Sequence, residues 1–199
     1  MSRIRARATA ALSSLFFVAA ACDRSPTPIA IDATPTAARV IAPLESHGTS
    51  FGAEVNTDLA LLRQVTAQFH DVASAWRAGW SAAITPCMSD PAGSGAMGIH
   101  YGKPSLITDG TVRVDQPELL MYEPEKNGTL RLVGVEYIVP LTLWTSPNPP
   151  RLFGRDFKVN EAFQVWALHA WVWNENPSGM FADWNPKVSC VDASSAGSM

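Results

Sequence analysis

The chain has 199 residues, of which 47% are hydrophobic and 17% are charged. This is enough apolar material for one hydrophobic core, and it argues against two large domains. The formal net charge of −3 leaves no broad basic surface, so nucleic acid is not an expected partner.

Residues 1–22 have the features of an export signal: early arginines, then an apolar run that ends on small residues before Cys22. The run is too short to be interpreted first as a membrane span. Cleavage after Ala21 would give a secreted protein. The sequence Ala-Ala-Ala-Cys also resembles a bacterial lipobox, although it lacks the usual leucine, and we favour lipidation of Cys22. This anchor would be the protein's only attachment to a membrane.

Residues 23–50 are rich in Pro, Ala and Thr and show no apolar period, which is typical of a disordered, solvated linker. We expect a single globular domain over residues 51–192 and a disordered tail over residues 193–199.

Cys87 and Cys190 form a pair once Cys22 is set aside. In an exported protein such a pair is more often bridged than free. The bridge would close a loop of about a hundred residues and add about 4 to 5 kcal/mol in the chain-entropy model. Two buried thiols are the alternative.

The first periodic stretch predicts an amphipathic helix over about 58–80. Asn56 or Thr57 can cap it, and Gly79 lies near its end. His70 falls outside the apolar stripe and is expected to be solvated. The apolar residues recur at three- and four-residue steps: Leu59, Leu62, Val65, Phe69, Val72 or Ala73, Trp76 and Trp80.

The next stretch contains GSGAMG, which matches the glycine pattern of a dinucleotide-binding loop. That loop needs a strand before the glycines and a helix after them. Here Pro86 and Asp90-Pro91 precede the glycines, and the strand-like Ile99–Tyr101 follows. We therefore interpret residues 81–96 as a flexible loop that enters a strand.

From residue 97 onward, short apolar runs separated by turn residues are typical of β structure. Asn127-Gly128 predicts a tight hairpin turn, and TSPNPPRLFGRDF is too rich in proline for more than a surface loop. The predicted strands are 97–101, 111–115, 118–123, 129–139 and 163–173.

The stretch 163–173, FQVWALHAWVW, fits both a helical and a strand period. Its tryptophans and valines favour a strand. A strand places His169, Trp171 and Trp173 on one face, with Trp166, Leu168, Ala170 and Val172 on the other. Residues 176–190 are expected to form a closing loop that acts mainly in stability.

Common catalytic signatures such as HExxH, paired CxxC and GxSxG are absent from the sequence. Instead, His100, Glu136 and His169 each stand within an apolar strand. Alternate residues of antiparallel strands share a face, so the three can converge. Burying them without partners is costly, and two histidines with one carboxylate can bind a first-row divalent metal with open positions.

Further residues could complete such a site. Glu123 could be a fourth ligand or could orient one, and four aromatic residues could wall a cavity for a small molecule: Tyr101, Tyr137, Trp171 and Trp173. Three interpretations remain open, namely a structural polar network, a small-ligand pocket and a metal site.

The strings MGIHY, VGVEYIVP and LHAWVWNENPSGMFADWNPKVSC, in this order, resemble a family of exported bacterial proteins. The resemblance covers roughly residues 58–191. It implies that the helix, the strands and both cysteines belong to one unit, and it carries no established activity.

These features together predict an α+β domain: one long N-terminal helix on an antiparallel sheet or partial barrel, closed by Cys87–Cys190. The leading hypothesis is an exported or lipid-anchored cell-envelope protein that binds a small molecule or a metal ion. One alternative is a metal-dependent envelope enzyme that uses His100, Glu136 and His169. The other is a structural or interaction protein with no ligand.

Overall fold

The computed structural model describes residues 51–194, and these residues belong to one compact unit. The expected export signal, the lipidation site Cys22, the linker over 23–50 and residues 195–199 of the expected tail lie outside the described residues. Within the described part of the chain, no helix has the length and apolar character that crossing a membrane requires.

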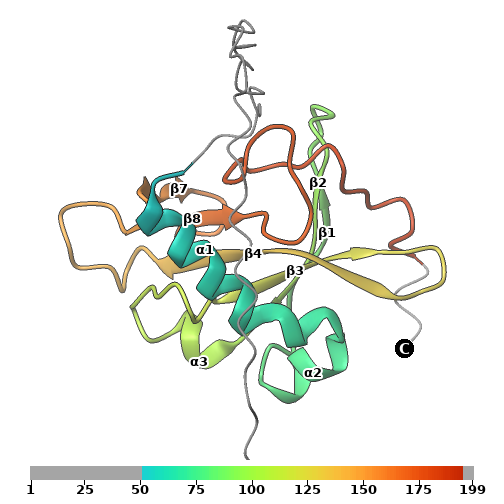
Figure 1. Cartoon of the computed structure of the whole chain (residues 1–199), viewed down its shortest axis with the longest axis horizontal. Coiled ribbons are helices and arrows are strands. Elements are labelled where there is room, and N and C mark those ends of the chain that lie inside the picture. Colours follow the sequence, from blue (N-terminus) through green and yellow to red (C-terminus); the bar gives the residue numbers. More distant parts are fainter. Residues whose placement is uncertain (1–50, 195–199) are drawn as a thin grey trace, which may run out of the picture. The chain divides into compact units, whose positions relative to one another are not determined.

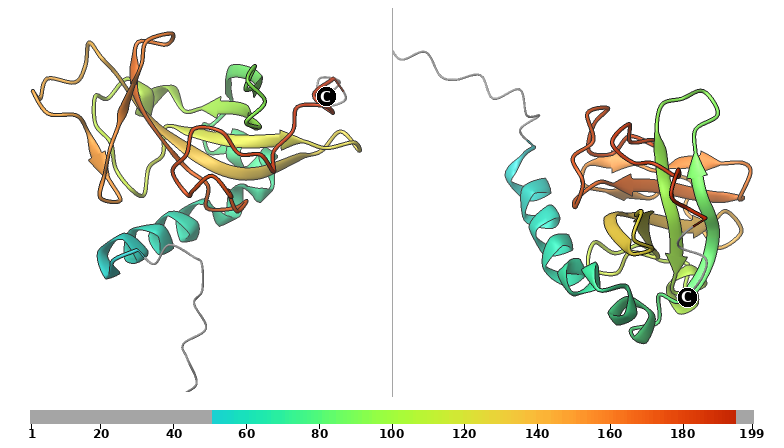
Figure 2. Two further views of the ribbon diagram at one scale, coloured as in Figure 1. Left: turned by 90° about the horizontal axis from the view of Figure 1, so that it is seen from above. Right: turned by 90° about the vertical axis from the view of Figure 1, so that its right-hand side faces the viewer.

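A six-stranded sheet forms the centre of the fold, and all its neighbouring strands are antiparallel. It curls into a half-barrel, so the predicted α+β class and partial barrel are confirmed (Figures 1 and 2). The strands follow in the order β1 (Ala82–Ser89), β2 (Ala96–Gly102), β3 (Leu119–Pro124), β4 (Leu130–Pro140), β8 (Val165–Ala170) and β7 (Lys158–Asn160).

The predicted helix over 58–80 is not one long helix. It consists of α1 (Ala53–Thr66), a 3-10 turn (Ala67–His70) and α2 (Val72–Arg77). The Tyr122 hydroxyl on β3 donates to the carbonyl of Phe69, and Asp71 has an extended backbone. The Asp71 carboxylate accepts the N–H of Ala73, so it caps a new helix where the apolar period alone would continue the old one.

The main hydrophobic core lies between these helices and one face of the sheet, and α1 runs across that face in Figure 1. Its buried members include Leu59, Leu62 and Phe69 from the helices with Leu120, Tyr122, Leu132, Val135, Tyr137 and Leu168 from the strands. The opposite face of the sheet carries two smaller apolar clusters and buried polar residues.

Residues 82–89 form an edge strand, β1, where the sequence predicted a flexible loop. None of its residues is buried, and its pairing with β2 contains register shifts, so it lacks the alternation that marks a strand. Pro86 is compatible with the edge of a sheet. Gly98 in GSGAMG has a φ of 88°, and a Cβ there would lie 2.4 Å from the carbonyl oxygen of Tyr122. Close packing of β2 on β3 explains this glycine without a nucleotide.

Residues 111–115 form no strand, contrary to the prediction. The Asp109 carboxylate accepts both the N–H and the hydroxyl of Thr111, and Arg113 contacts the same carboxylate. Such local bonds compete with strand pairing. Val112 and Val114 still pack against the core, so their alternation reflects burial alone. A short helix, α3 (Pro104–Ile107), precedes this segment.

The proline-rich stretch contains a small hairpin, β5 (Arg151–Leu152) and β6 (Arg155–Asp156), that the sequence did not predict. Phe153 and Gly154 form its turn with φ angles of 52° and 68°. Phe153 is buried and packs on Tyr137 and Phe181 with ring centroids 5.7 Å and 5.5 Å apart. These contacts hold an aromatic residue in a backbone conformation that it rarely adopts.

The hairpin between β3 and β4 is confirmed. Gly128 has a φ of 81°, its N–H donates to the carbonyl of Glu125, and the N–H of Glu125 donates to the carbonyl of Thr129. The connection is therefore a three-residue turn with a glycine bulge.

The predicted strand over 163–173 is confirmed as a strand, β8, over Val165–Ala170. The chain leaves the sheet at Trp171, whose N–H donates to the carbonyl of Met180. The following loop returns to β2, where Ala96 and Asn185 exchange backbone hydrogen bonds, and the predicted Cys87–Cys190 disulfide joins its end to β1.

Candidate metal centre

The register of the sheet places His100, Glu136 and His169 on one face. Glu136 lies opposite His169 in the β4–β8 pair, and His100 lies opposite Met121 on β3. Met121 in turn lies opposite Gly134, two residues before Glu136. Directly paired residues of antiparallel strands share a face, so the three polar residues meet on the face away from the helical core. The curl of the sheet brings His100 across β3 to Glu136.

The three side chains are in contact. Nε2 of His100 lies 3.3 Å from Oε2 of Glu136, and Nε2 of His169 lies 3.5 Å from Oε1. The exposed fractions of the three residues are 2%, 7% and 5% in sequence order. Within residues 51–194, this is the single group of three or more His, Cys, Asp or Glu side chains whose ligand atoms lie close enough, within 4.8 Å, to hold one ion.

Neither Nε2 atom makes a hydrogen bond, although both rings are buried. An unpaired buried nitrogen is costly, and native structures contain few of them. Two ligand atoms about 2.1 Å from a common ion at a tetrahedral angle lie about 3.4 Å apart, which is close to both nitrogen–oxygen separations given above. The geometry therefore suits a cation shared between the rings and the carboxylate better than a hydrogen-bonded network.

The other nitrogen of each ring faces an oxygen atom. Oγ1 of Thr85 lies 2.7 Å from Nδ1 of His100, and Oδ1 of Asp183 lies 3.8 Å from Nδ1 of His169. Lys158 holds Asp183 at 2.9 Å. Metal-binding histidines usually have an oxygen partner at their second nitrogen, which orients the ring. The hydrogen bond to Thr85 orients the His100 ring, whereas the Asp183 oxygen lies beyond hydrogen-bond distance of His169. Both rings present Nε2 to Glu136.

The protonation state of His100 also suits metal binding. Burial lowers the pKa of His100 to about 4, an effect that Glu136 opposes and His169 reinforces. The ring is therefore neutral near pH 7, and the neutral imidazole is the form that binds metal ions.

A cavity of about 340 Å³ opens beside this group. Its polar lining consists of His100, Glu136, Thr85 and Asn160, and among the described residues that line it there is no lysine or arginine. The remaining lining residues are apolar: Ile84, Met88, Met97, Leu119, Ile138, Ala162, Phe163, Val165 and Trp184.

Tyr101 and Tyr137 do not wall this cavity, contrary to the prediction. Tyr101 follows His100 and Tyr137 follows Glu136, and consecutive residues of a strand point to opposite faces. Tyr101 packs on Trp76 beneath α2, with ring centroids 5.7 Å apart. The hydroxyl of Tyr137 donates to the carbonyl of Val114. Both belong to the helix-covered core.

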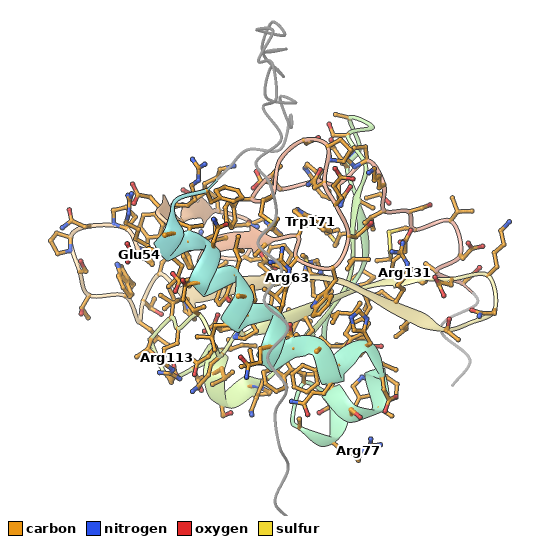
Figure 3. All side chains as sticks on the ribbon, viewed as in Figure 1. Glu54, Arg63, Arg77, Arg113, Arg131 and Trp171 are labelled. Atoms are coloured by element: carbon orange, nitrogen blue, oxygen red, sulfur yellow. A yellow bond between two sulfur atoms is a disulfide. The ribbon has the colours of Figure 1, made fainter. Side chains whose placement is uncertain are left out.

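Glu123 is not a ligand of this site. It makes an ion pair with Arg131, and its Oε1 accepts the N–H of Ser189 at 2.9 Å. Figure 3 places Arg131 on the hairpin arm of β3 and β4, away from Trp171 at the end of β8. The structure therefore does not bring Glu123 into the group of His100, Glu136 and His169, for which it was predicted as a fourth or orienting residue.

Trp171 and Trp173, which were predicted to share one face of the strand, lie on different sides of the sheet. The Trp171 ring stacks on that of His169 with centroids 6.3 Å apart, so it supports the site without lining the cavity. Trp173 lies on the helical side, because Nε1 of Trp173 donates to the hydroxyl of Thr66 and its ring packs on His70. The chain has left the strand by this point, so the alternation that grouped the two residues no longer holds.

Three residues of the site region were missed by the sequence reasoning. Thr85 lies in β1, a segment for which the sequence predicted a loop. Asp183 and Trp184 come from the closing loop, whose path follows no strand period. This loop was expected to act mainly in stability, yet it places a carboxylate oxygen 3.8 Å from Nδ1 of His169 and supplies a wall of the cavity.

No known protein family matches this chain, and neither a curated protein nor a solved structure matches it. Membership of the exported bacterial family suggested by the three sequence strings therefore stays a prediction.

Proposed function

We propose that this protein binds a divalent first-row metal ion through His100, Glu136 and His169, as an exported or lipid-anchored protein of the bacterial cell envelope. The observation that carries the proposal is the convergence of two buried, unpartnered imidazole nitrogens on one buried carboxylate. The Cys87–Cys190 bridge supports an oxidising compartment outside the cytosol.

The tautomer of His100 bears on the choice between a metal site and a structural network. When Nδ1 of His100 donates to Thr85, the lone pair of Nε2 faces an oxygen of Glu136. A lone pair and a carboxylate repel each other in a buried setting, and a cation between them removes the repulsion. Three ligands from the chain leave coordination positions free.

Two nitrogen ligands and one oxygen ligand suit Zn(II), Fe(II) and neighbouring first-row ions. Such an ion acts as a Lewis acid toward a molecule that reaches its free positions. Since His100 and Glu136 both line the cavity, we propose that those positions are reached from there.

Elemental analysis tests this function. Protein purified from its natural compartment should carry about one equivalent of a first-row metal. His100→Ala, His169→Ala and Glu136→Gln should each lose most of it, because each removes one of the three protein ligands that a zinc site with an open position uses. His70→Ala removes an exposed histidine, and Glu118→Gln replaces a buried carboxylate outside the site, so both should keep the metal.

Circular dichroism of every variant separates loss of metal from loss of fold. Wild-type protein that is isolated without metal and does not bind added Zn(II) would contradict the proposed function. Metal retained by both histidine variants would remove these histidines as ligands.

A further inference from the structure

The proposed metal site would have a net positive charge that the residues around it do not neutralise. A divalent ion bound by one carboxylate and two neutral imidazoles has a net charge of about +1. The negative charge of Asp183 beside His169 is balanced by Lys158 at 2.9 Å. A buried net positive charge is costly unless it is paired. A bound ligand with one negative charge would therefore be favoured at this site.

The apolar walls of the cavity favour a ligand whose remaining part is apolar. Leu119, Ile138 and Val165 lie buried along it, and two large apolar residues that line it remain exposed. Phe163 is 51% exposed and Ile84 is 39% exposed. Exposed apolar side chains at a cavity are typical of a binding site for an apolar group.

The polar lining is too sparse for a sugar or a nucleotide. The Thr85 hydroxyl is paired with His100, and Oδ1 of Asn160 accepts the N–H of Phe163. Apart from the proposed metal ligands, these are the polar residues that line the cavity. A cavity of about 340 Å³ lies at the small end of the range for ligand sites, roughly 300 to 1,000 Å³, so a compact ligand fits best.

We infer that the cavity binds a small amphiphilic monoanion, whose carboxylate coordinates the metal ion and whose hydrocarbon part lies along Leu119, Ile138, Val165 and Phe163. This inference rests on the proposed metal-binding function. It carries a specific requirement, because a carboxylate that enters the metal-free cavity meets Glu136 and no lysine or arginine among the lining residues described here. Binding of the anion therefore depends on the metal.

Titration calorimetry with octanoate, acetate and octylammonium tests the inference on Zn(II)-loaded and metal-free protein. Each buried methylene tightens binding about fourfold. Octanoate should therefore bind the loaded protein at least about tenfold more tightly than acetate does, and at least about tenfold more tightly than it binds the metal-free protein. Octylammonium has the same chain length and the opposite charge, so it should not compete.

Two variants test whether octanoate binds in this cavity. Ala162→Trp fills the exposed edge of the cavity, and it should weaken octanoate binding at least about tenfold while the zinc content stays unchanged. Ala92→Trp, in the exposed turn between β1 and β2, is the matched control and should bind octanoate as the wild type does.

The outcomes separate the inference from the function on which it rests. Zinc binding without octanoate binding overturns the inference and leaves the metal site intact. Equal octanoate binding with and without zinc overturns coordination of the carboxylate, and acetate that binds as tightly as octanoate overturns the apolar part. Unchanged binding to Ala162→Trp places octanoate elsewhere. Failure to bind zinc overturns the proposed function and the inference together.

Discussion

Glu118 shows how strongly one buried residue can couple this fold to pH. It is 1% exposed, and its Oε2 accepts the N–H of Ile138 at 3.1 Å. Burial raises the pKa of Glu118 from 4.5 to about 8; backbone hydrogen bonds and Arg113 act in the opposite direction, and Asp109 adds to the rise. Near pH 7 the folded protein therefore keeps a proton on Glu118 that the unfolded chain has released.

This proton makes stability fall with rising pH. Because the folded pKa is the higher one, the contribution of Glu118 is fully present below about pH 4.5 and is lost as the pH rises through about 8. The loss is at most about 5 kcal/mol, at 1.36 kcal/mol for each unit of pKa shift. The glutamine in Glu118→Gln stays neutral at every pH. We therefore expect the free energy of unfolding of this variant, relative to that of the wild type, to rise by several kcal/mol from pH 5 to pH 9 in urea unfolding.

The exposed Glu54→Gln provides the control, with the same change in charge at the surface. It should show no comparable gain. A stability difference between wild type and Glu118→Gln that is the same at both pH values would show that Glu118 does not carry its proton into the neutral range.

The closing loop after β8 contains two buried asparagines, and Asn185 is the more deeply buried of them. Asn185 is 0% exposed, and its Nδ2 lies 3.4 Å from the carbonyl oxygens of both Asn174 and Glu175. Its Oδ1 accepts the N–H of Lys187 at 2.9 Å, while its backbone pairs with Ala96 on β2. Together with Asn176, whose Nδ2 donates to the carbonyl of Trp184 at 2.9 Å, this side chain holds the path that carries Asp183 and Trp184 to the site.

Replacing this side chain should loosen the loop. Asn185→Ala leaves two carbonyls and one N–H without their partner, and we expect a loss of about 2 to 4 kcal/mol in the free energy of unfolding. Hydrogen exchange should rise selectively in the loop. The exposed Asn148→Ala serves as the matched control and should change stability by no more than about 0.5 kcal/mol. Wild-type exchange rates in Asn185→Ala would refute the role assigned to this residue.

At the scale of the whole domain, the Cys87–Cys190 disulfide joins the edge strand β1 to the end of the closing loop. The two cysteines are 103 residues apart in the sequence, and their Cα atoms lie 5.6 Å apart. The bridge therefore restrains most of the folded chain, from the cavity wall on β1 to the segment beyond β8.

Removing the bridge should cost much of the stability. In the chain-entropy model a loop of this length contributes about 4 to 5 kcal/mol, against a typical total of about 5 to 15 kcal/mol. We expect Cys87→Ser/Cys190→Ser to lower the free energy of unfolding, measured by urea denaturation, by that amount. Reduction should destabilise the wild type equally and leave the double variant unchanged. A difference below about 1 kcal/mol would contradict a stabilising role for the bridge.

Several features of the fold and of the candidate site follow from local periodicity and composition alone. Short apolar runs separated by turn residues predicted β2, β3, β4 and β8, because a buried strand is a short apolar stretch that ends at a turn. His100, Glu136 and His169 were found because a polar residue stands out inside an apolar run. Setting Cys22 aside left one possible pairing of the cysteines.

Contacts between residues that are far apart in the chain could not be predicted from these local patterns. The Tyr122 hydroxyl reaches the helix at Phe69, and the packing of Phe153 creates a turn that its sequence does not favour. The curl of the sheet brings His100 to Glu136 across β3, and the closing loop delivers Asp183 to His169. Local patterns record which residues are buried, whereas the partner of each buried group depends on contacts between distant segments, and those contacts form only when the whole chain packs.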